Sequence, residues 1–142
     1  MTTADESYLL RILGDIDRFL VERLDPVLKD MGLGREHWQV LRLFEDGQGR
    51  SMGDIARTAG LPRATATRVV DLLTANALVY RRSDPLDRRR VLVYLADPGT
   101  ESLRRIEAAL VAHAAPALTT FAAHDRGKLA EFVDRLRRVQ AF

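Results

Sequence analysis

The sequence predicts a mainly α-helical fold with one small β-hairpin, in which a winged helix-turn-helix lies between N-terminal and C-terminal helices. Three observations support this class. Apolar residues recur with helical spacing at both ends of the chain, two short helical patterns separated by a glycine occupy residues 51–76, and two extended runs joined by turn residues occupy 78–95. We therefore divide the chain into an N-terminal helix at 1–34, a winged helix at 35–96 and C-terminal helices at 97–142.

The first helix is predicted by apolar side chains that recur at steps of three and four between residues 6 and 31. Pro26 lies inside this pattern, where it should kink or restart the helix, and Gly32 should help to end it. A second helix is predicted over 35–45. The turn at 46–49 has the wrong spacing for a phosphate-binding glycine loop, and no strand precedes it.

The helix-turn-helix is predicted from the signals at its helix ends. Ser51 should cap the first helix with Asp54 as its capping-box partner, and Gly60 should end that helix in the left-handed conformation. Pro62 suits the first position of the second helix, because that position needs no intrahelical N–H bond. This second helix, the recognition helix, is expected over about 62–76.

The hairpin and the last helices follow from turn residues and periodicity. Extended runs at 78–83 and 90–95 should pair as the two strands of a wing. A further helix should begin at about 97 and be interrupted at Pro116, and a last helix is expected over about 125–140.

Composition excludes several classes of protein. The chain has no cysteine, so disulfides, thiolate sensing and cysteine-based metal sites are excluded, and we expect no metal and no cofactor. It has no apolar run of about 18 residues and no signal-peptide pattern, which predicts a cytoplasmic protein without a membrane span. It also lacks a Ser-His-Asp spacing, a nucleophile elbow and a phosphate-binding loop, so we do not expect an enzyme.

The small net charge of +2 is distributed unevenly. Residues 63–95 carry seven basic and three acidic side chains, whereas residues 1–62 carry eight basic and eleven acidic ones. A polyanion would therefore meet one segment rather than the whole surface. Arginine supplies 20 of the 22 basic residues, a bias that a GC-rich genome also produces.

The recognition helix has two distinct faces when it is drawn at 100° per residue. The inward face is apolar, and the outward face begins with small or hydroxylated side chains and two arginines. The outward residues are Ala64, Thr67, Arg68 and Asp71, with Thr65 at the edge and Arg63 at the helix start. Alanine and threonine can contact a thymine methyl group, and arginine can bind guanine through two hydrogen bonds. An ordinary amphipathic helix with a solvated face would show the same pattern.

The hairpin strengthens the prediction of nucleic-acid binding. Its arginines are Arg81, Arg82, Arg88, Arg89 and Arg90. A solvated hairpin usually protects its edges with mixed charges, whereas a dense arginine tip suits the negative potential of a narrow minor groove. Asp87 precedes Arg89 by two residues and could hold its guanidinium through a pair of hydrogen bonds. An exposed local ion pair is the simpler interpretation.

Four stretches carry a family resemblance: GLPRATATR at 60–68, ALVYR at 77–81, DPLDRR at 84–89 and LADPG at 95–99. They resemble the MarR (multiple antibiotic resistance regulator) family of winged-helix transcription factors. The D-x-x-D-x-R pattern is the most specific of them, and Trp38 fits the family's preceding helix. The resemblance covers nearly the whole chain.

The resemblance implies a set of DNA contacts. Arg89 should enter the minor groove with Asp87 beside it, while the recognition helix lies in the major groove. The residues expected to form the DNA-binding surface are Arg63, Ala64, Thr65, Thr67, Arg68, Arg81, Arg82, Asp87, Arg88 and Arg89. The target would be a pseudo-palindromic operator in double-stranded DNA.

The resemblance also implies a homodimer whose first and last helices, at 1–34 and 97–142, interlock, and a repressor that a small, often aromatic, effector releases from DNA. His37 and Trp38 are candidates for the effector pocket, although Trp38 in the core and His37 on the surface is the simpler interpretation.

Three positions depart from the family pattern. Ala77 replaces a glycine before the wing, so Asn76 is expected to take the left-handed helix cap instead. Ala96 replaces a helix-start threonine, so Asp97 could cap that helix. Pro62 replaces a capping serine, which weakens the start of the recognition helix.

Two other functions remain open. A winged helix can serve as a protein-interaction module, although such a module has no need of several arginines at the tip of its wing. The chain could also bind DNA without responding to any effector. Salt dependence of binding distinguishes the first alternative, and loss of DNA affinity on adding a ligand distinguishes the second.

Overall fold

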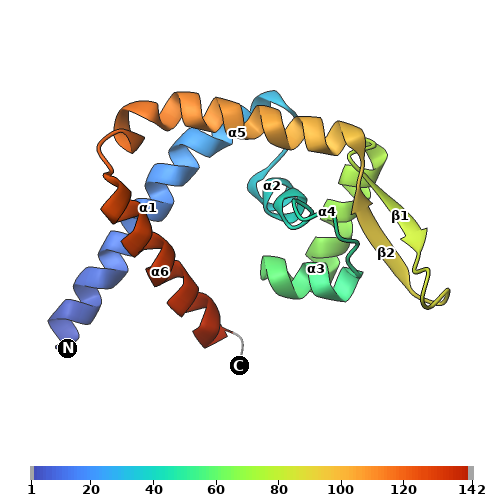
Figure 1. The fold of residues 1–142 in the computed structure, drawn as a ribbon, viewed down its shortest axis with the longest axis horizontal. Coiled ribbons are helices and arrows are strands. Elements are labelled where there is room, and N and C mark those ends of the chain that lie inside the picture. Colours follow the sequence, from blue (N-terminus) through green and yellow to red (C-terminus); the bar gives the residue numbers. More distant parts are fainter. Residues whose placement is uncertain (1, 141–142) are drawn as a thin grey trace. The chain divides into compact units, whose positions relative to one another are not determined.

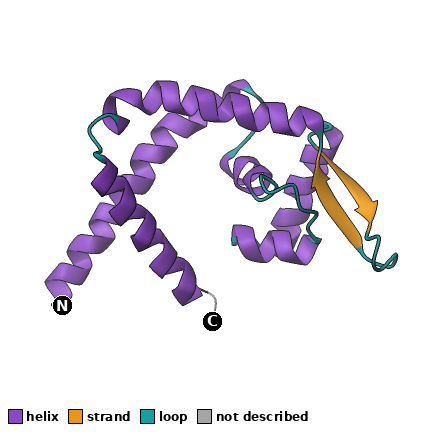
Figure 2. Ribbon diagram, viewed as in Figure 1, coloured by secondary structure: helices purple, strands orange, loops and turns teal. Residues whose placement is uncertain are grey.

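The computed structural model describes residues 2–140, over which the chain forms six helices and one two-stranded antiparallel sheet (Figure 1, Figure 2). The helices are α1 (Thr3–Asp30), α2 (Arg35–Arg42), α3 (Met52–Ala59), α4 (Arg63–Ala75), α5 (Asp97–Leu118) and α6 (Ala123–Gln140). The strands are β1 (Val79–Ser83) and β2 (Val91–Leu95). The predicted mainly helical fold with one hairpin is confirmed.

The chain forms two compact units, one up to Leu110 and one from Val111 onwards, so that the boundary lies within α5. The first unit contains the helix-turn-helix, the hairpin, α1 and most of α5, packed around one hydrophobic core. The most deeply buried large side chains of this core are Leu28, Val40, Leu41, Phe44, Ile55, Val70, Leu73, Val79, Val93 and Ile106. Because they come from every element of the unit, the core fixes α4 and the hairpin relative to each other.

Helix α1 continues through Pro26, so the predicted restart at this residue was wrong, while the alternative, a kink, stays a prediction. A proline inside a helix removes one backbone hydrogen bond. Here Leu24, Val27 and Leu28 are buried on both sides of the proline, and this burial keeps the helix continuous. The helix ends where predicted, with Gly32 in the left-handed region at φ 70°.

The turn between α3 and α4 follows the prediction with two differences. Gly60 ends α3 in the left-handed conformation, at φ 66° and ψ 31°. The backbone N–H of Asp54 donates to Ser51 Oγ at 3.2 Å, but the Ser51 backbone N–H does not donate to the Asp54 carboxylate in return, so only half of the capping box forms. Pro62 precedes α4 as its N-cap residue rather than occupying its first turn.

Ala77 adopts the left-handed conformation at φ 57°, whereas Asn76 has φ −90°, so the expectation for Asn76 was wrong. The reason is the hydrogen-bonding pattern at the end of α4. The N–H of Leu78 donates to the carbonyl of Leu73 at 2.9 Å and the N–H of Ala77 donates to that of Thr74 at 3.0 Å. This Schellman pattern requires the left-handed conformation at residue 77, whichever side chain stands there.

We predict that Ala77→Gly stabilises the protein, raising its free energy of unfolding by about 0.5–1 kcal/mol. Glycine relieves the strain of a Cβ at positive φ, and its greater flexibility in the unfolded chain offsets part of this gain. Chemical denaturation at fixed protein concentration measures the change. Ala108→Gly, at an exposed position inside α5, is the matched control and should destabilise by about 1 kcal/mol. A loss of stability for both variants would contradict the argument.

Helix α5 begins at Asp97, and Ala96 alone separates it from the end of strand β2. Asp97 is therefore its first helical residue and Ala96 the residue before it, which corrects the expectation that Asp97 caps the helix. The N–H of Ala96 donates to the carbonyl of Leu78 at 3.0 Å, and Gly99 is buried against the same carbonyl. Pro116 does not interrupt α5, which continues to Leu118.

Exposed apolar side chains line parts of both units. In the first unit they lie on the first two-thirds of α1: Tyr8, Leu9, Leu10, Leu13, Ile16 and Leu20. In the second unit they lie at the end of α5, in the following turn and on α6: Val111, Leu118, Phe121, Leu129, Val133, Leu136 and Val139. So many exposed large apolar side chains on a few helices are typical of a protein–protein interface.

No single helix within residues 2–140 is long and apolar enough to cross a membrane. Helices α5 and α6 pass that test only when they are counted as one segment across a bend of 118°.

Candidate nucleic-acid interface

Helix α4 presents the two faces that the sequence predicts. Ala66, Val69, Val70 and Leu73 are buried in the core of the first unit. The opposite face is exposed, and Thr65 is half-buried at its edge. The exposed residues are Arg63, Ala64, Thr67, Arg68 and Asp71. The outward part of the helix is therefore available to a partner along its first two turns.

The arginines at the start of this face form no ion pair with acidic side chains of the described chain. Thr67 Oγ1 donates to the carbonyl of Arg63 at 3.0 Å, and one guanidinium nitrogen of Arg68 lies 3.5 Å from Thr65 Oγ1. No carboxylate within residues 2–140 forms an ion pair with Arg63 or Arg68. Two arginines without acidic partners on one exposed helix face suit an anionic ligand.

The wing is a regular antiparallel hairpin in which Val79 pairs with Leu95 and Ser83 with Val91. The outer edge of β2 is also anchored, because the backbone groups of Arg50 and Val93 exchange hydrogen bonds of 2.9 and 2.8 Å. Buried Val79 and Val93 fix its base to the core. The hairpin tip extends away from the helices of its unit (Figure 1).

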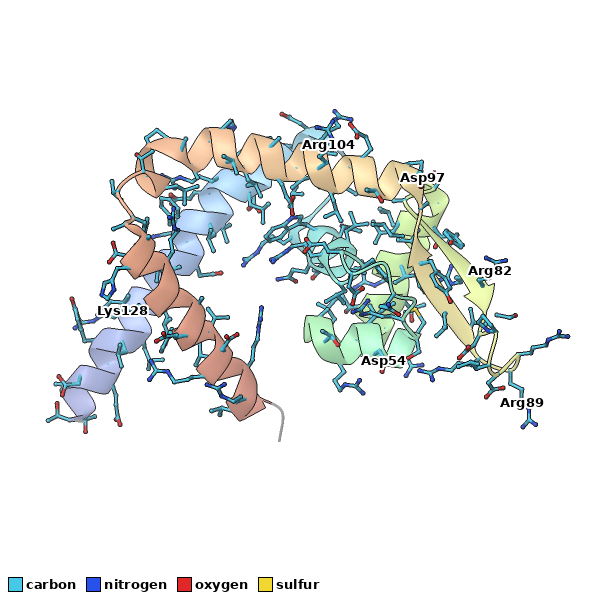
Figure 3. The ribbon with its side chains drawn as sticks, viewed as in Figure 1. Asp54, Arg82, Arg89, Asp97, Arg104 and Lys128 are labelled. Carbon is cyan, nitrogen blue, oxygen red and sulfur yellow. The ribbon has the colours of Figure 1, made fainter. Side chains whose placement is uncertain are left out.

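Asp87 shapes the tip of the wing in a way that sequence reasoning did not predict. Its Oδ1 accepts the backbone N–H of Arg89 at 3.1 Å, and no ion pair between the two side chains is present. The predicted pair of hydrogen bonds to the guanidinium was therefore wrong, because the two-residue spacing favours a turn bond to the backbone. The Arg89 side chain points away from the hairpin into solvent (Figure 3).

The other wing arginines differ in their partners. Arg81 donates to Asp71 Oδ1 at 2.6 Å and to Thr74 Oγ1 at 3.2 Å, so it ties β1 to the recognition helix. Arg82 and Arg88 are exposed and form no ion pair within the described chain, and Arg82 lies on β1 (Figure 3). Arg81 thus holds β1 against α4, while Arg82 and Arg88 add positive charge that is unpaired within the described chain.

Sequence reasoning missed the contact between Asp54 on α3 and Arg90 at the end of the wing. Arg90 donates to Asp54 Oδ2 at 3.3 Å, and Arg57 donates to Oδ1 at 2.8 Å. A hydrogen bond with the Ser51 side chain, followed by the bond from Arg57, lowers the pKa of the Asp54 carboxyl, which is therefore ionised at neutral pH. No local signal could have revealed a pair 36 residues apart.

His37 and Trp38, the predicted effector residues, have different roles. His37 Nδ1 accepts the backbone N–H of Gly34 at 3.0 Å and so caps α2, and burial lowers the pKa of this imidazole, which keeps it neutral. Trp38 packs against the core with Arg42 over its ring at 4.8 Å. Its Nε1 is buried and, within the described residues, has no hydrogen-bond acceptor.

No group of three or more His, Asp or Glu side chains within residues 2–140 is arranged to hold a metal ion.

A sequence model of the MarR family matches residues 31–90, the segment that contains α2, the helix-turn-helix and most of the wing. Two curated relatives match a longer stretch. The putative transcriptional regulatory protein for the hcr operon of Thauera aromatica is 28% identical over 99 residues, 70% of this chain and 60% of the relative. The transcriptional repressor MprA of Escherichia coli K12 is 27% identical over 103 residues, 71% of this chain and 58% of the relative.

The chain thus aligns with about three-fifths of the length of these curated relatives. Among solved structures, CouR from Rhodococcus jostii RHA1 bound to p-coumaroyl-CoA superimposes with a TM-score of 0.79 at 21% identity. The match covers 98% of this chain and 96% of CouR. At this level of identity it shows a shared fold, which includes the terminal helices as well as the winged helix.

Proposed function

Because a MarR-family sequence model matches residues 31–90, we propose that this chain is a member of that family and a sequence-specific regulator of transcription that binds double-stranded DNA. The observation that carries the proposal is the presence of two exposed basic elements on one compact unit. The first turns of α4 present Arg63 and Arg68, and the tip of the wing presents Arg88 and Arg89. A recognition helix and a wing of this kind suit adjacent grooves of one duplex.

In the proposed complex, α4 lies in the major groove. Ala64, Thr65 and Thr67 are small enough to let the helix approach the base edges, and Arg68 would bind a guanine or a phosphate, with Arg63 beside it. The wing would place Arg89 in the neighbouring minor groove. Arg82 and Arg88 would contact the DNA backbone, while Arg81 and Asp87 keep the wing in shape.

The proposal includes a homodimer that brings two such readers onto one pseudo-palindromic operator. The exposed apolar side chains of 1–34 and of 97–142 support it, because a monomer would leave them in water. A two-fold dimer would place the recognition helices in successive major grooves, about 10–10.5 base pairs apart.

We place the protein in the cytoplasm, where such DNA is available. Like MprA by its name, it would act as a repressor.

Selection of duplexes from a random DNA library, followed by fluorescence anisotropy across salt concentrations, tests the proposal. We expect enrichment of an inverted repeat, bound tightly and with an affinity that falls steeply as salt increases. A protein-interaction module would enrich no sequence, and its weak binding would be equal for selected and scrambled duplexes.

We further propose that a small aromatic effector binds beside Trp38. Two observations support this site. The indole N–H is buried without an acceptor, which costs free energy that an oxygen of a ligand could recover. The structurally similar CouR was crystallised with p-coumaroyl-CoA, a ligand with a phenolic ring. His37 is engaged in capping α2, so Trp38 rather than His37 would contact the effector.

Trp38 is the single tryptophan of the chain, so intrinsic fluorescence reports on this site directly. We predict that p-coumaroyl-CoA or the free p-coumarate changes the Trp38 emission saturably and weakens binding to the selected duplex at the same concentrations. Trp38→Phe keeps the apolar ring but removes the N–H donor, and it should lower the sensitivity of DNA binding to the ligand. Unchanged emission and unchanged DNA affinity with both compounds would argue for a regulator that does not respond to this class of ligand.

A further inference from the structure

Asp54 is an acidic residue on α3 that contacts two arginines, one of them from the wing. Its Oδ1 accepts from Arg57 on its own helix at 2.8 Å, and its Oδ2 accepts from Arg90 of the wing at 3.3 Å. Within residues 2–140, the Arg90–Asp54 contact is the ion pair that joins the hairpin to α3. Figure 3 shows Asp54 on α3, the helix next to the recognition helix, and Arg89 at the far end of the wing.

The anchor at the α3 end of this contact is firm. The backbone N–H of Asp54 is capped by Ser51 Oγ, and the next two residues, Ile55 and Ala56, are buried in the core. The wing end is less constrained, since residues 85–90 are all exposed and, apart from the bond of Arg90 to Asp54, their hydrogen bonds are those of the turn itself. A bond from Arg90 to a fixed carboxylate therefore limits where the tip of the wing can lie.

Through its charge alone, Asp54 would weaken binding to DNA. A carboxylate on a DNA-facing surface repels phosphates, and it partly neutralises Arg57 and Arg90, which would otherwise attract them. If Asp54 contributed only its charge, removing it would strengthen binding to every duplex by the same factor. A role in geometry has a different signature, because geometry matters only when a helix and a wing must reach defined groove positions together.

We propose that Asp54 is a positioning residue for sequence recognition: by holding Arg90, it fixes the wing at the distance from α4 at which both elements engage one operator half-site. The inference rests on the proposed function. In this view the wing and the recognition helix form a single DNA-binding surface, held together by an ion pair between α3 and the tip of the hairpin.

The test compares the affinity for the duplex selected by the wild-type chain with the affinity for a scrambled duplex. For Asp54→Asn we expect affinity for the scrambled duplex to stay or increase, and the ratio of the two affinities to fall about two- to fivefold per protomer, the range for an exposed ion pair. Glu101→Gln is the matched control. It removes the same charge from an exposed ion pair, with Arg104 on α5, and should leave the ratio unchanged.

Charge reversal separates position from charge. Arg90→Asp should lower the ratio, and combining it with Asp54→Arg, which restores both the pair and the net charge, should recover most of it. The inference is overturned if Asp54→Asn increases the affinity for both duplexes by the same factor. It is also overturned if the charge-reversed double variant fails to recover the affinity ratio although circular dichroism shows that this variant is folded. A wild-type chain that selects no sequence contradicts the proposed function as well, whereas selection by the wild type with an unchanged ratio in Asp54→Asn overturns the positioning role alone.

Discussion

Replacing Gly99 with alanine is expected to lower the free energy of unfolding by about 2–4 kcal/mol, the largest stability effect of a single added methyl group that the structure predicts. A Cβ at this position would lie 2.1 Å from the carbonyl oxygen of Leu78 and 2.6 Å from the Leu95 side chain. The first neighbour is backbone and cannot rotate away. Helix α5 would therefore have to move off the base of the wing.

That movement would break more than one contact. The Leu78 carbonyl accepts the N–H of Ala96, the bond that joins the residue before β1 to the residue after β2. Leu78 and Leu103 are buried close to this junction and would be partly exposed. Because the junction connects the wing to α5, we also expect Gly99→Ala to weaken DNA binding at temperatures where the variant is still folded.

Urea denaturation at fixed protein concentration measures the stability change, since a dimer's apparent stability depends on concentration. Gly127→Ala is the matched control. Gly127 also lies in a helix, α6, but a Cβ there would meet nothing within 4 Å, so alanine should stabilise by up to about 1 kcal/mol. Equal and small changes in the two variants would show that α5 can shift without cost, contrary to the close contact seen at Gly99.

The sequence was most informative where local rules decide the structure. Gly60 and the buried face of α4 lie as their spacing predicts, because a helix end and an amphipathic face depend on neighbours a few residues away. The strands of the wing begin within one residue of their predicted positions for the same reason. These elements alone were enough to predict a winged helix-turn-helix.

The errors have a common physical cause, which is competition from contacts made elsewhere. Asn76 would suit the left-handed cap better than alanine, but the bond of Leu78 to Leu73 assigns that conformation to Ala77. Pro26 should end a helix, but the burial of its neighbours keeps α1 intact. Local preferences amount to about 1 kcal/mol or less for most residues and about 3 kcal/mol for a proline inside a helix, which the burial of several apolar side chains can exceed.

The partners of charged side chains were the least predictable part of the site. Arginine has a long reach, so its sequence position does not say which carboxylate it meets. Arg81 and Arg90 find acids on other elements, while Arg89, for which an acidic neighbour was predicted, has none within the described chain. The sequence thus indicated a basic wing without distinguishing the arginines that build it from those left to bind DNA.

Arg89→Ala is expected to weaken binding to the selected duplex about thirtyfold while leaving the fold unchanged. The estimate takes about 1 kcal/mol for one arginine contact in each protomer of the proposed dimer. Arg89 is exposed at the tip of the wing, and its guanidinium forms no ion pair within residues 2–140, so truncation removes no intramolecular contact of that group. The bond from its backbone N–H to Asp87 does not depend on the side chain, so the turn should persist.

Fluorescence anisotropy across salt concentrations checks both the loss and its origin. If Arg89 neutralises a phosphate in each half-site, the dependence of log K on log salt should become shallower by about two counterions per dimer. If it lies in a narrow minor groove, the loss should be greatest for duplexes with A·T pairs where the wing lies. Arg104→Ala, which removes the same charge from α5, should change affinity little. An equal loss in the two variants would mean that Arg89 acts only through net charge, and an unchanged dissociation constant would remove the wing from the interface.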